Sequence, residues 1–432
     1  MQALVLAAGK GTRMKSERPK VLHEILGKPV LGHVLDTLET VGATKIHVVI
    51  GSGAGQVRSY LKRRAGGPKI AVIFQREQKG TGHAVEMARP SLAKERGEIL
   101  IWPGDMPLLE ASTLREFSKQ HRKSGAVASV LSCLRVDPKG YGRVLRAAGQ
   151  FIAIREELDA SELECRIQEV NTGVYLFQTQ KLFEALRKIK PANAKKEFYL
   201  TDTIEVLAAE GAPLEAFPFA LEKEGQGINS RNDLAEATRV MRNREVQRHL
   251  GNGVTFVSPG QTYVEPGVRI GADTVIHPWC YIETGVKIGK GCQIGPFAKI
   301  RKGSVIDDGA IVGSFVEINR SHLGKKVTAK HLTYLGDAVI GEGTNIGAGV
   351  ITANFDGVKK HLTKIGKKVL VGSNTVFVAP VVIEDHAKTG AGAVVTGGSR
   401  VKKGQVVAGV PARPIEAKRI GHSAKPKNRK KF

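Results

Sequence analysis

Apolar and polar positions follow two different rules along this chain. Up to about residue 229, strand-like apolar runs alternate with amphipathic, helix-like stretches. The segments 45–53 (KIHVVIGSG) and 98–109 (EILIWPGDMPLL) predict buried strands that end in loops, whereas 29–42 and 81–93 predict helices. Such alternation is typical of an α/β domain with a mostly parallel sheet covered on both faces, which binds its ligands at the carboxyl ends of the strands.

A six-residue period governs the second half. Residues 230–250 predict one charged helix, with Ser230 and Gly251 as its caps. Beyond it, every sixth residue is aliphatic, and after an interruption the step resumes. A fixed period of six means one inward side chain per short strand and predicts a parallel β-helix of hexapeptide repeats. The two series are Val264, Ile270, Ile276, Ile282, Ile288, Ile294, Ile300, Ile306, Val312 and Ile318, then Ile365, Val371, Phe377, Ile383, Thr389, Val395, Val401 and Val407.

These patterns divide the 432 residues into an α/β domain (1–229), a linker helix (230–250), a β-helix (251–417) and a basic tail (418–432). The formal net charge of +25 favours anionic ligands such as nucleotides, sugar phosphates or coenzyme A. The tail is interpreted as a solvated segment, with contact to polyphosphate or nucleic acid as the alternative. A nucleic-acid-binding protein is disfavoured, because the sequence contains no recognised binding module or interleaved aromatic residues.

The cysteines and the apolar runs bear on localisation. The four cysteines form no CxxC pair and no disulfide-like framework, and no apolar run approaches the roughly 18 residues of a membrane span. The first eight residues are too short, and lack the leading charge, for a signal peptide. We therefore expect a cytoplasmic protein with reduced thiols and no membrane span.

A glycine-rich turn followed by cations comes directly after the first strand, in residues 6–20 (LAAGKGTRMKSERPK). Bare glycines let backbone N–H groups approach a ligand, and the cations indicate that this ligand carries phosphate. The spacing does not fit a Walker A loop, and Met14 stands where a dinucleotide fingerprint needs its third glycine. Another kind of phosphate loop is required.

The stretch resembles the LxxGxGxRx(n)PK signature of sugar nucleotidyltransferases. Together with the hexapeptide period, it makes nearly the whole chain similar to the family of bacterial bifunctional N-acetylglucosamine-1-phosphate uridylyltransferases and glucosamine-1-phosphate N-acetyltransferases. This resemblance implies a Rossmann-like nucleotidyltransferase domain followed by a left-handed β-helix acetyltransferase domain in a homotrimer. It also implies four substrates: acetyl-CoA, glucosamine 1-phosphate, UTP and N-acetylglucosamine 1-phosphate, serving UDP-N-acetylglucosamine synthesis for the cell wall.

For the first site, the resemblance implies catalytic roles for Arg13 and Lys20 and a Mg²⁺ site at Asp105 and Asn229. Nucleotidyl transfer gathers strongly repelling anions, so cations, backbone donors and a metal suit it. Glu156 is matched to the sugar pocket, although its neighbour Glu157 leaves the register open by one. The remaining nucleotide and sugar positions implied are Leu6, Ala7, Ala8, Gly9, Gln75, Gly80, Thr81, Gly104, Gly142 and Asn171.

For the second site, the resemblance makes His331 the catalytic base, since moving an acetyl group to an amine requires removal of a proton. Taken alone, this histidine would be interpreted as structural. The implied amino-sugar-phosphate ligands are Arg301, Asn319, Tyr334 and Asn345, and the implied acetyl-CoA positions are Ala348, Asn354, Phe355, Ser373, Ala391 and Arg413.

One position departs from the family: Asn319 stands where the family has lysine. Asparagine can donate a hydrogen bond to phosphate but carries no charge. We expect the adjacent Arg320 to point to the opposite face, because neighbouring side chains alternate in a strand. The alternatives left open are a β-helix that serves only trimerisation or regulation, acetylation of another amino-sugar phosphate, and a different nucleotide.

Overall fold

The computed structural model describes residues 1–64 and 67–415; the predicted basic tail, 418–432, lies outside this part. The chain forms two compact units, Met1–Met241 and Arg242 onward. The 20-residue helix α9 (Arg231–Leu250) crosses the boundary between them. Within the described residues, none of the helices combines the length and apolar character needed to cross a membrane.

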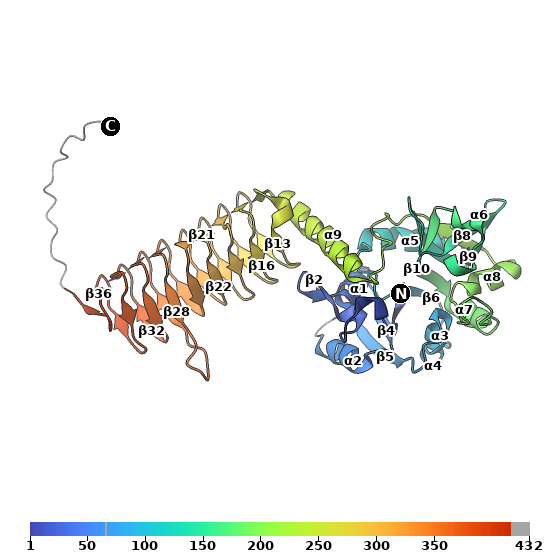
Figure 1. Ribbon diagram of the computed structural model, residues 1–432, viewed down its shortest axis with the longest axis horizontal. Helices are drawn as coiled ribbons and strands as arrows, with labels where there is room; N and C mark the ends of the chain where they lie inside the picture. Colours follow the sequence, from blue (N-terminus) through green and yellow to red (C-terminus); the bar gives the residue numbers. More distant parts are fainter. Residues whose placement is uncertain (65–66, 416–432) are drawn as a thin grey trace, which may run out of the picture. The chain divides into compact units, whose positions relative to one another are not determined.

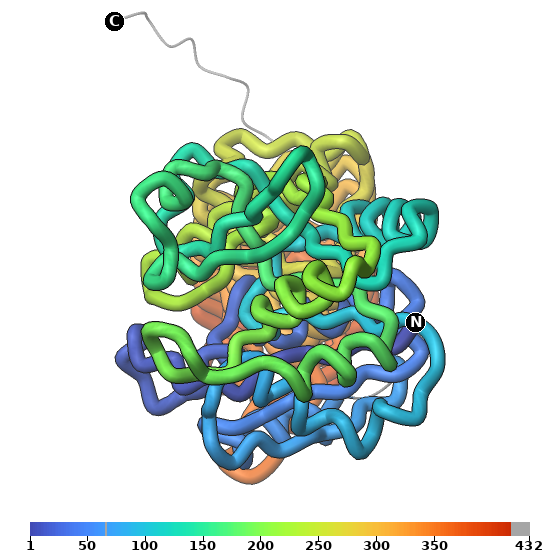
Figure 2. The backbone as a smooth tube through the Cα atoms, turned by 90° about the vertical axis from the view of Figure 1, so that its right-hand side faces the viewer, coloured from blue at the N-terminus to red at the C-terminus, as the bar shows by residue number. Residues whose placement is uncertain are grey.

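The first unit contains one mixed sheet with the strand order β11-β7-β10-β6-β1-β4-β5, to which β8 and β9 are added beside β10. The strands β6, β1, β4 and β5 run parallel, as predicted. Figure 2 lets the reader follow the backbone from blue β1 to green β11. The strands are β1 (Gln2–Ala7), β2 (Glu24–Ile25), β3 (Lys28–Pro29), β4 (Lys45–Ile50), β5 (Lys69–Phe74), β6 (Glu98–Pro103), β7 (Ala128–Leu134), β8 (Arg143–Ala147), β9 (Gln150–Arg155), β10 (Glu169–Gln178) and β11 (Leu214–Phe217).

Apolar layers cover both faces of this sheet. Along β1, Ala3 and Val5 belong to one buried cluster and Leu4 to another, which is the period-two alternation of a strand buried on both sides. With both faces covered, the carboxyl ends of β1 and β6 are left to hold a ligand. The helices are α1 (Val30–Thr40), α2 (Ala54–Arg63), α3 (Thr81–Glu86), α4 (Arg89–Leu92), α5 (Ala111–Ser124), α6 (Glu162–Cys165), α7 (Thr179–Leu186) and α8 (Asp202–Ala209), with short 3₁₀ turns η1 (Thr12–Met14), η2 (Lys20–Leu22) and η3 (Glu157–Asp159).

The second unit is a β-helix of three parallel sheets, here called faces one, two and three, whose short strands stack coil upon coil (Figure 1). A further 3₁₀ turn, η4 (Pro259–Gln261), precedes the first full coil, and the last strand, β37, pairs antiparallel. Face one holds β12 (Thr255–Phe256), β15 (Val275–Ile276), β18 (Gln293–Ile294), β21 (Ile311–Ser314), β24 (Thr328–His331), β27 (Asn345–Ile346), β30 (Leu370–Val371), β33 (Lys388–Thr389), β36 (Val406–Ala408) and β37 (Arg413–Pro414). Face two holds β13 (Tyr263–Val264), β16 (Tyr281–Ile282), β19 (Lys299–Ile300), β22 (Glu317–Asn319), β25 (Tyr334–Gly336), β28 (Ile351–Ala353), β31 (Val376–Val378) and β34 (Val394–Val395). Face three holds β14 (Arg269–Ile270), β17 (Lys287–Ile288), β20 (Val305–Ile306), β23 (His322–Leu323), β26 (Ala338–Ile340), β29 (Thr363–Ile365), β32 (Val381–Ile383) and β35 (Arg400–Val401).

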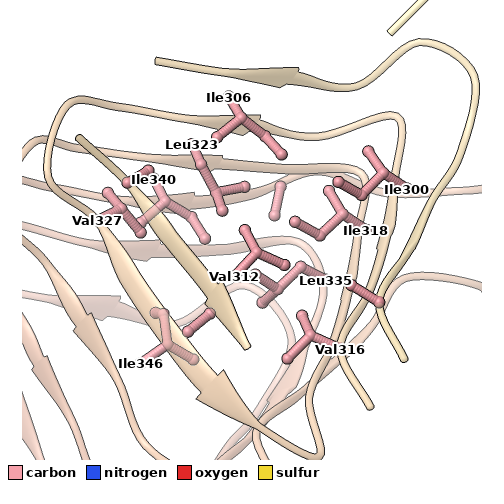
Figure 3. Close-up of a cluster of buried hydrophobic side chains, with 14 of the residues drawn as sticks. Ile300, Ile306, Val312, Val316, Ile318, Leu323, Val327, Leu335, Ile340 and Ile346 are labelled. Atoms are coloured by element: carbon pink, nitrogen blue, oxygen red, sulfur yellow. The ribbon is translucent and has the colours of Figure 1, made fainter. Parts of the chain in front are cut away.

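The side chains of the six-residue series fill the interior of the coils. Every member of both series is buried, from Val264 to Val407. Figure 3 shows aliphatic side chains of the central coils, such as Ile300, Ile318 and Leu335, meeting inside the triangle. The predicted α/β domain followed by a hexapeptide β-helix is therefore confirmed.

The interruption in the series is not an interruption of the coil. The inward positions continue through Ile318, Leu323, Leu335 and Ile340, but the steps from 318 to 323 and from 335 to 340 are five residues long. Both shortened steps lie at the corner between faces two and three. At the same corner of the next coil, residues 354–362 are inserted as a loop between β28 and β29, which projects from the orange part of the stack in Figure 1. Three successive coils are thus irregular at one corner.

Candidate active sites

A cleft of about 760 Å³ lies at the carboxyl ends of β1 and β6. It is lined by the loop that follows β1, by the start of α3, by the β8–β9 region and by the segment before α9. Nearly all of the first-site residues implied by the sequence meet here. They are Leu6, Ala7, Ala8, Gly9, Lys20, Gln75, Gly80, Thr81, Asp105, Gly142, Glu156, Asn171 and Asn229.

At two positions of the loops around the cleft, close packing requires glycine. A Cβ atom on Gly11, whose φ is +61°, would lie 2.8 Å from Cβ of Lys20, so this glycine lets Lys20 pack against the loop. A Cβ on Gly80, whose φ is +107°, would lie 2.4 Å from the carbonyl oxygen of Phe198. Both positions exclude any side chain.

Lys20 joins the two residues implied as metal ligands. Its Nζ forms an ion pair with Asp105 and donates a hydrogen bond of 3.0 Å to Oδ1 of Asn229. Asn229 is held in turn by Asp233, whose carboxylate accepts hydrogen bonds from the backbone N–H groups of Asn229 and Ser230 at the start of α9. One carboxylate oxygen and one amide oxygen therefore converge on a single cation.

This donor pair fits Mg²⁺, which takes few protein carboxylates and completes its coordination with phosphate oxygens and water. Within residues 1–64 and 67–415, no cluster of three or more histidine, cysteine, aspartate or glutamate side chains could hold a metal by itself. A magnesium ion at Asp105 and Asn229 would thus depend on its nucleotide for the remaining ligands, and it would have to displace the ammonium group of Lys20.

A second cavity of about 400 Å³ adjoins the cleft, and both are lined by Asp105 and Asn229. Arg13 lines this cavity rather than the main cleft, together with Arg135 and Lys139, which the sequence did not single out. The three cations place positive charge beside the Asp105–Asn229 pair, a suitable environment for phosphate groups.

At the end of the cleft expected to read the base, Gln75 is buried and its Nε2 donates to the carbonyl oxygen of Gly80 at 3.2 Å. The same nitrogen lies 3.0 Å from Nδ1 of His83. Gln75 therefore braces the Gly80 turn that opens α3. In contrast, Gly104 lies behind the cleft, because its N–H donates to Leu6 at 2.9 Å as an extension of the sheet.

At the sugar end, Glu156 faces the cleft and accepts a hydrogen bond of 3.3 Å from Thr201. Glu157 instead accepts a hydrogen bond from the N–H of Gly140 and lies 3.6 Å from Arg143, so that of the two carboxylates Glu156 is the one that lines the cleft. Burial raises the pKa of Glu156 above its usual range, with the Thr201 hydrogen bond opposing the shift. A carboxyl group that faces the cleft and is held by Thr201 can form hydrogen bonds with the hydroxyl groups of a sugar.

Asn171 lies beside this carboxylate at a bulge of β10, where the register with β7 shifts. Its Nδ2 donates to the Tyr175 hydroxyl at 2.7 Å and its Oδ1 accepts from the N–H of Gly173 at 2.8 Å. The amide is therefore fixed in orientation. Sequence reasoning did not name several cleft residues, either because they lie beside motif residues, as Lys10 does, or because they come from a segment without a motif, as Lys195 does. They are Lys10, Gln78, Tyr141, Thr172, Lys195, Glu197 and Thr201.

On the β-helix, His331 ends β24 at the corner between faces one and two. The exposed imidazole has no hydrogen-bond or ion-pair partner within the described ranges. Ala348, Ser373 and Ala391 occupy the corresponding position of the following coils, and backbone hydrogen bonds from Gly349, Asn374 and Gly392 connect the four coils in turn. The histidine therefore heads a column of small residues that leaves the backbone accessible.

The residues implied for the amino-sugar phosphate lie mainly on face two. Arg301 follows β19, Asn319 ends β22 and Tyr334 begins β25, so they come from three successive coils. Arg301 lies 3.1 Å from Glu317. Asn345 is on face one, where its Oδ1 accepts from Thr328 at 2.7 Å.

The residues implied for acetyl-CoA do not all join the His331 column. Asn354 and Phe355 lie at the opposite corner, where the inserted loop begins, and Arg413 lies in β37. Phe355 is exposed. The second set of candidate residues is thus distributed over two corners of one chain.

Arg320 does not point away from Asn319, so the expectation from strand alternation is wrong. β22 ends at Asn319, and Arg320 has φ +50°, which turns its side chain back toward the corner. Its Nη1 donates to Oδ1 of Asn319 at 2.9 Å, and its Nε and Nη2 each donate to the Asp337 carboxylate at 2.7 Å. The shortened step at this corner is what brings the guanidinium beside the amide.

The sequence is similar to known proteins over most of its length. Residues 3–199 match the MobA-like NTP transferase domain, and residues 285–320 and 362–397 match the bacterial transferase hexapeptide model of six repeats. The protein named Bifunctional protein GlmU of Heliobacterium modesticaldum is 43% identical, covering 91% of this chain and 92% of that protein. The proteins of the same name from Geobacillus sp. and Levilactobacillus brevis are 41% and 38% identical at the same coverage. The α/β unit with its phosphate loop and the hexapeptide β-helix behind it thus occur together in these relatives, and the chain belongs to the family of bifunctional GlmU proteins.

Proposed function

We propose that this chain makes UDP-N-acetylglucosamine in two steps at two separate sites. Residues 251–417 transfer an acetyl group from acetyl-CoA to glucosamine 1-phosphate, and residues 1–229 transfer a uridylyl group from UTP to the product, with 230–250 connecting them. The observation that supports this most is the 760 Å³ cleft, in which a glycine-rich phosphate loop, a two-oxygen cation site and a polar sugar end converge.

In uridylyl transfer, a phosphate oxygen of N-acetylglucosamine 1-phosphate attacks the α-phosphorus of UTP, and pyrophosphate leaves. Backbone N–H groups of the loop after β1 bind the triphosphate, and Lys20 and Arg13 offset its charge. Gln75, Gly80 and Thr81 hold the base, while Gly142, Glu156 and Asn171 hold the sugar. The cleft thereby aligns the attacking oxygen with the phosphorus, because catalysis of this kind depends on position and electrostatics.

We further propose that Asp105 and Asn229 hold Mg²⁺ when nucleotide binds. The ion supplies charge stabilisation for the phosphoryl oxygens. Lys20, which contacts both of these side chains in the free chain, would then be available to offset the charge of the phosphates.

In acetyl transfer, the amine nitrogen of glucosamine 1-phosphate attacks the thioester carbonyl carbon of acetyl-CoA. The imidazole of His331 accepts the proton that the amine loses, the C–N bond forms, and the C–S bond breaks to release coenzyme A as its thiol. The accessible backbone along Ala348, Ser373 and Ala391 offers a track for the extended pantetheine arm.

We propose a homotrimer, because the second set of residues is divided between two corners and an exposed apolar column adjoins His331. The column consists of Trp279, Phe297, Phe315 and Leu332, one per coil, with neighbouring rings stacked 4.7 and 4.9 Å apart. Contact with a second chain would cover this column and bring the groups of another corner to His331. We place both reactions in the cytoplasm, where UTP and acetyl-CoA are available.

Two assays on the purified full chain test the proposal. The first measures thiol release from acetyl-CoA with glucosamine 1-phosphate, and the second measures pyrophosphate release from UTP with N-acetylglucosamine 1-phosphate and Mg²⁺. We expect both signals, each strictly dependent on its own sugar phosphate. Pyrophosphate without thiol release would leave the β-helix as a trimerisation or regulatory module, and a preference for another nucleoside triphosphate would overturn the uridylyl assignment.

A further inference from the structure

The irregular corner of the β-helix assembles a hydrogen-bonded group that the regular coils lack. Arg320, Asp337 and Asn354 each follow a strand of face two, in three successive coils. The Asp337 carboxylate accepts hydrogen bonds from Nε and Nη2 of Arg320, and Nδ2 of Asn354 donates to the same carboxylate. The Arg320 guanidinium lowers the pKa of Asp337, so the carboxylate is charged across the physiological range.

The position of this group follows from the two five-residue steps. In a regular coil, such as that from β19 to β20, four residues separate the strands of faces two and three. Only residues 320–321 separate β22 from β23, and only Asp337 separates β25 from β26. The shortened corners stack Arg320 directly on Asp337, and Arg320 keeps one nitrogen, Nη1, free of this ion pair.

That nitrogen sets the orientation of Asn319. A guanidinium only donates, so Oδ1 of Asn319 must be the acceptor in the 2.9 Å contact, and Nδ2 must face the other way. Nδ2 lies 3.5 Å from the Tyr334 hydroxyl oxygen. A hydroxyl that accepts from Asn319 directs its own O–H outward. A Cβ on Gly336 would lie 2.5 Å from the Tyr334 hydroxyl, so the ring depends on this glycine to fold over toward Asn319.

We propose that Arg320 is a positioning residue for the phosphate of the acetyl acceptor: through Asn319 it orients and polarises the Tyr334 hydroxyl, and so replaces by hydrogen bonds part of the attraction that a lysine at 319 would supply directly. Asn319 is only 5% exposed, so Tyr334 and Arg301 make the direct contacts with the phosphate. Asp337 fixes the guanidinium without using Nη1. The inference deepens the proposed acetyl transfer and rests on it.

The test is a set of variants of the full chain assayed by thiol release. In Arg320→Gln we expect the KM for glucosamine 1-phosphate to rise about tenfold with kcat within about twofold, since one charge-assisted hydrogen bond is lost. In the double variant Asn319→Lys/Arg320→Gln we expect the KM to return to within about threefold of the wild-type value. Arg400→Gln, which removes an exposed guanidinium paired with Glu384 on another coil, is the matched control and leaves both constants unchanged.

Recovery of the KM in the double variant separates a positioning role from structural support. A lysine at 319 can attract the phosphate directly, but it does not restore the ion pair between residue 320 and Asp337. An unchanged KM in Arg320→Gln, or a double variant no better than the single one, would overturn the inference. A rise in the KM for acetyl-CoA of the same size would do so too, because it would indicate a general distortion of the corner at Asn354.

Should Arg320→Gln be insoluble, Arg320→Lys takes its place. A single ammonium cannot contact Asp337 in fork fashion and Asn319 together, so we expect the KM for glucosamine 1-phosphate to rise about threefold. No rise would overturn the inference. If the wild-type chain is inactive toward glucosamine 1-phosphate, the proposed function itself fails; if it is active and these variants behave like it, only the role of Arg320 fails.

Discussion

The cleft of the α/β unit and the surface around His331, the two sites proposed to bind a sugar phosphate beside an anionic co-substrate, are built in different ways. In the α/β unit, one chain surrounds about 760 Å³ with loops from strand ends, and side chains far apart in sequence meet there. On the β-helix, the candidate side chains follow the coil repeat and are spread over several successive coils. A parallel sheet with both faces covered concentrates its loops at one edge, whereas a solenoid distributes them along its length.

The two sites also differ in the contacts that their side chains make before a ligand binds. Lys20, Asp105 and Asn229 satisfy one another before any ligand arrives, so binding must replace existing contacts. The His331 imidazole has no such partner in the part of the chain that the structure describes. The first site is thus prepared within one chain, whereas the proposed homotrimer would complete the second site with groups from a neighbouring chain.

The largest expected effect comes from a substitution of His331 on the β-helix, which tests whether the two reactions use separate sites. We expect His331→Ala to lower kcat for acetyl transfer about a thousandfold, because a positioned general base contributes roughly 10²–10⁴. Pyrophosphate release from the same preparation stays within about twofold. His322→Ala, which removes an exposed histidine paired with Asp307 on face three, is the control and retains acetyl transfer. Equal loss in both histidine variants would contradict the role of His331.

The reciprocal change is Asp105→Ala. It removes one of two oxygens of the cation site and leaves Lys20 without its ion-pair partner, so we expect uridylyl transfer to fall about a hundredfold or more. Acetyl transfer, measured as thiol release, is unaffected. Asp137→Ala, an exposed aspartate on the loop after β7, serves as the control. A parallel loss of acetyl transfer in Asp105→Ala would mean that the sites are not independent.

The fold was largely predictable because its signals are local and repeated. Alternating strands and helices indicated the α/β unit, and each residue of the six-residue series, such as Ile300 or Phe377, is buried as predicted. The irregular corner was not predictable: two five-residue steps look like an interruption in sequence, although the coil continues. Strand alternation gave the wrong direction for Arg320 because the strand ends one residue earlier.

Candidate-site residues that belong to a sequence motif could be predicted. Residues that are brought together only by tertiary contacts could not. Most of the first-site residues implied by family resemblance line the cleft, with Gly104 and Arg13 as the exceptions. The contacts of Lys20 span 85 and 209 residues of sequence, and no periodicity connects these segments. Loop residues such as Lys195 and Thr201 reach the cleft through the tertiary fold alone, and nothing in their local sequence distinguishes them.

A prediction of intermediate size tests the dependence of the second site on a neighbour. In Phe315→Asp a charge enters the exposed aromatic column, where φ is +56° and aspartate is tolerated. We expect the assembly to dissociate to single chains and acetyl transfer to fall about tenfold, with uridylyl transfer unchanged. Light scattering coupled to size exclusion gives the mass. Leu134→Asp, an exposed apolar position in the α/β unit, changes neither property. If Phe315→Asp forms single chains that keep full acetyl transfer, the proposal that neighbouring chains share the second site is wrong.

The smallest expected effect concerns Asp202, the first residue of α8, which follows the cleft residue Thr201. Burial, reinforced by Glu205, Glu156 and Asp159, raises the pKa of Asp202 to about 6. Its contribution to stability is therefore present at low pH and is lost as pH rises through about 6, because the native carboxylate must then ionise in unfavourable surroundings. Asparagine avoids this cost. We expect Asp202→Asn to be as stable as wild type near pH 4 and more stable by about 1 kcal/mol at pH 7.5, after allowance for solvent screening.

For a unit of this size, that difference corresponds to a midpoint about 2–4 °C higher at pH 7.5. The measurement is thermal unfolding of the full chain, with residual uridylyl transfer after heating used to assign the transition to the α/β unit. Asp137→Asn, which alters an exposed carboxylate, shows no pH-dependent difference from wild type. A shift for Asp202→Asn that is equal at pH 4 and pH 7.5 would trace to packing and not to ionisation. A shift confined to high pH would mean that the ionised Asp202 carboxylate lowers the stability of the native α/β unit, because burial and the nearby acidic groups disfavour its charge.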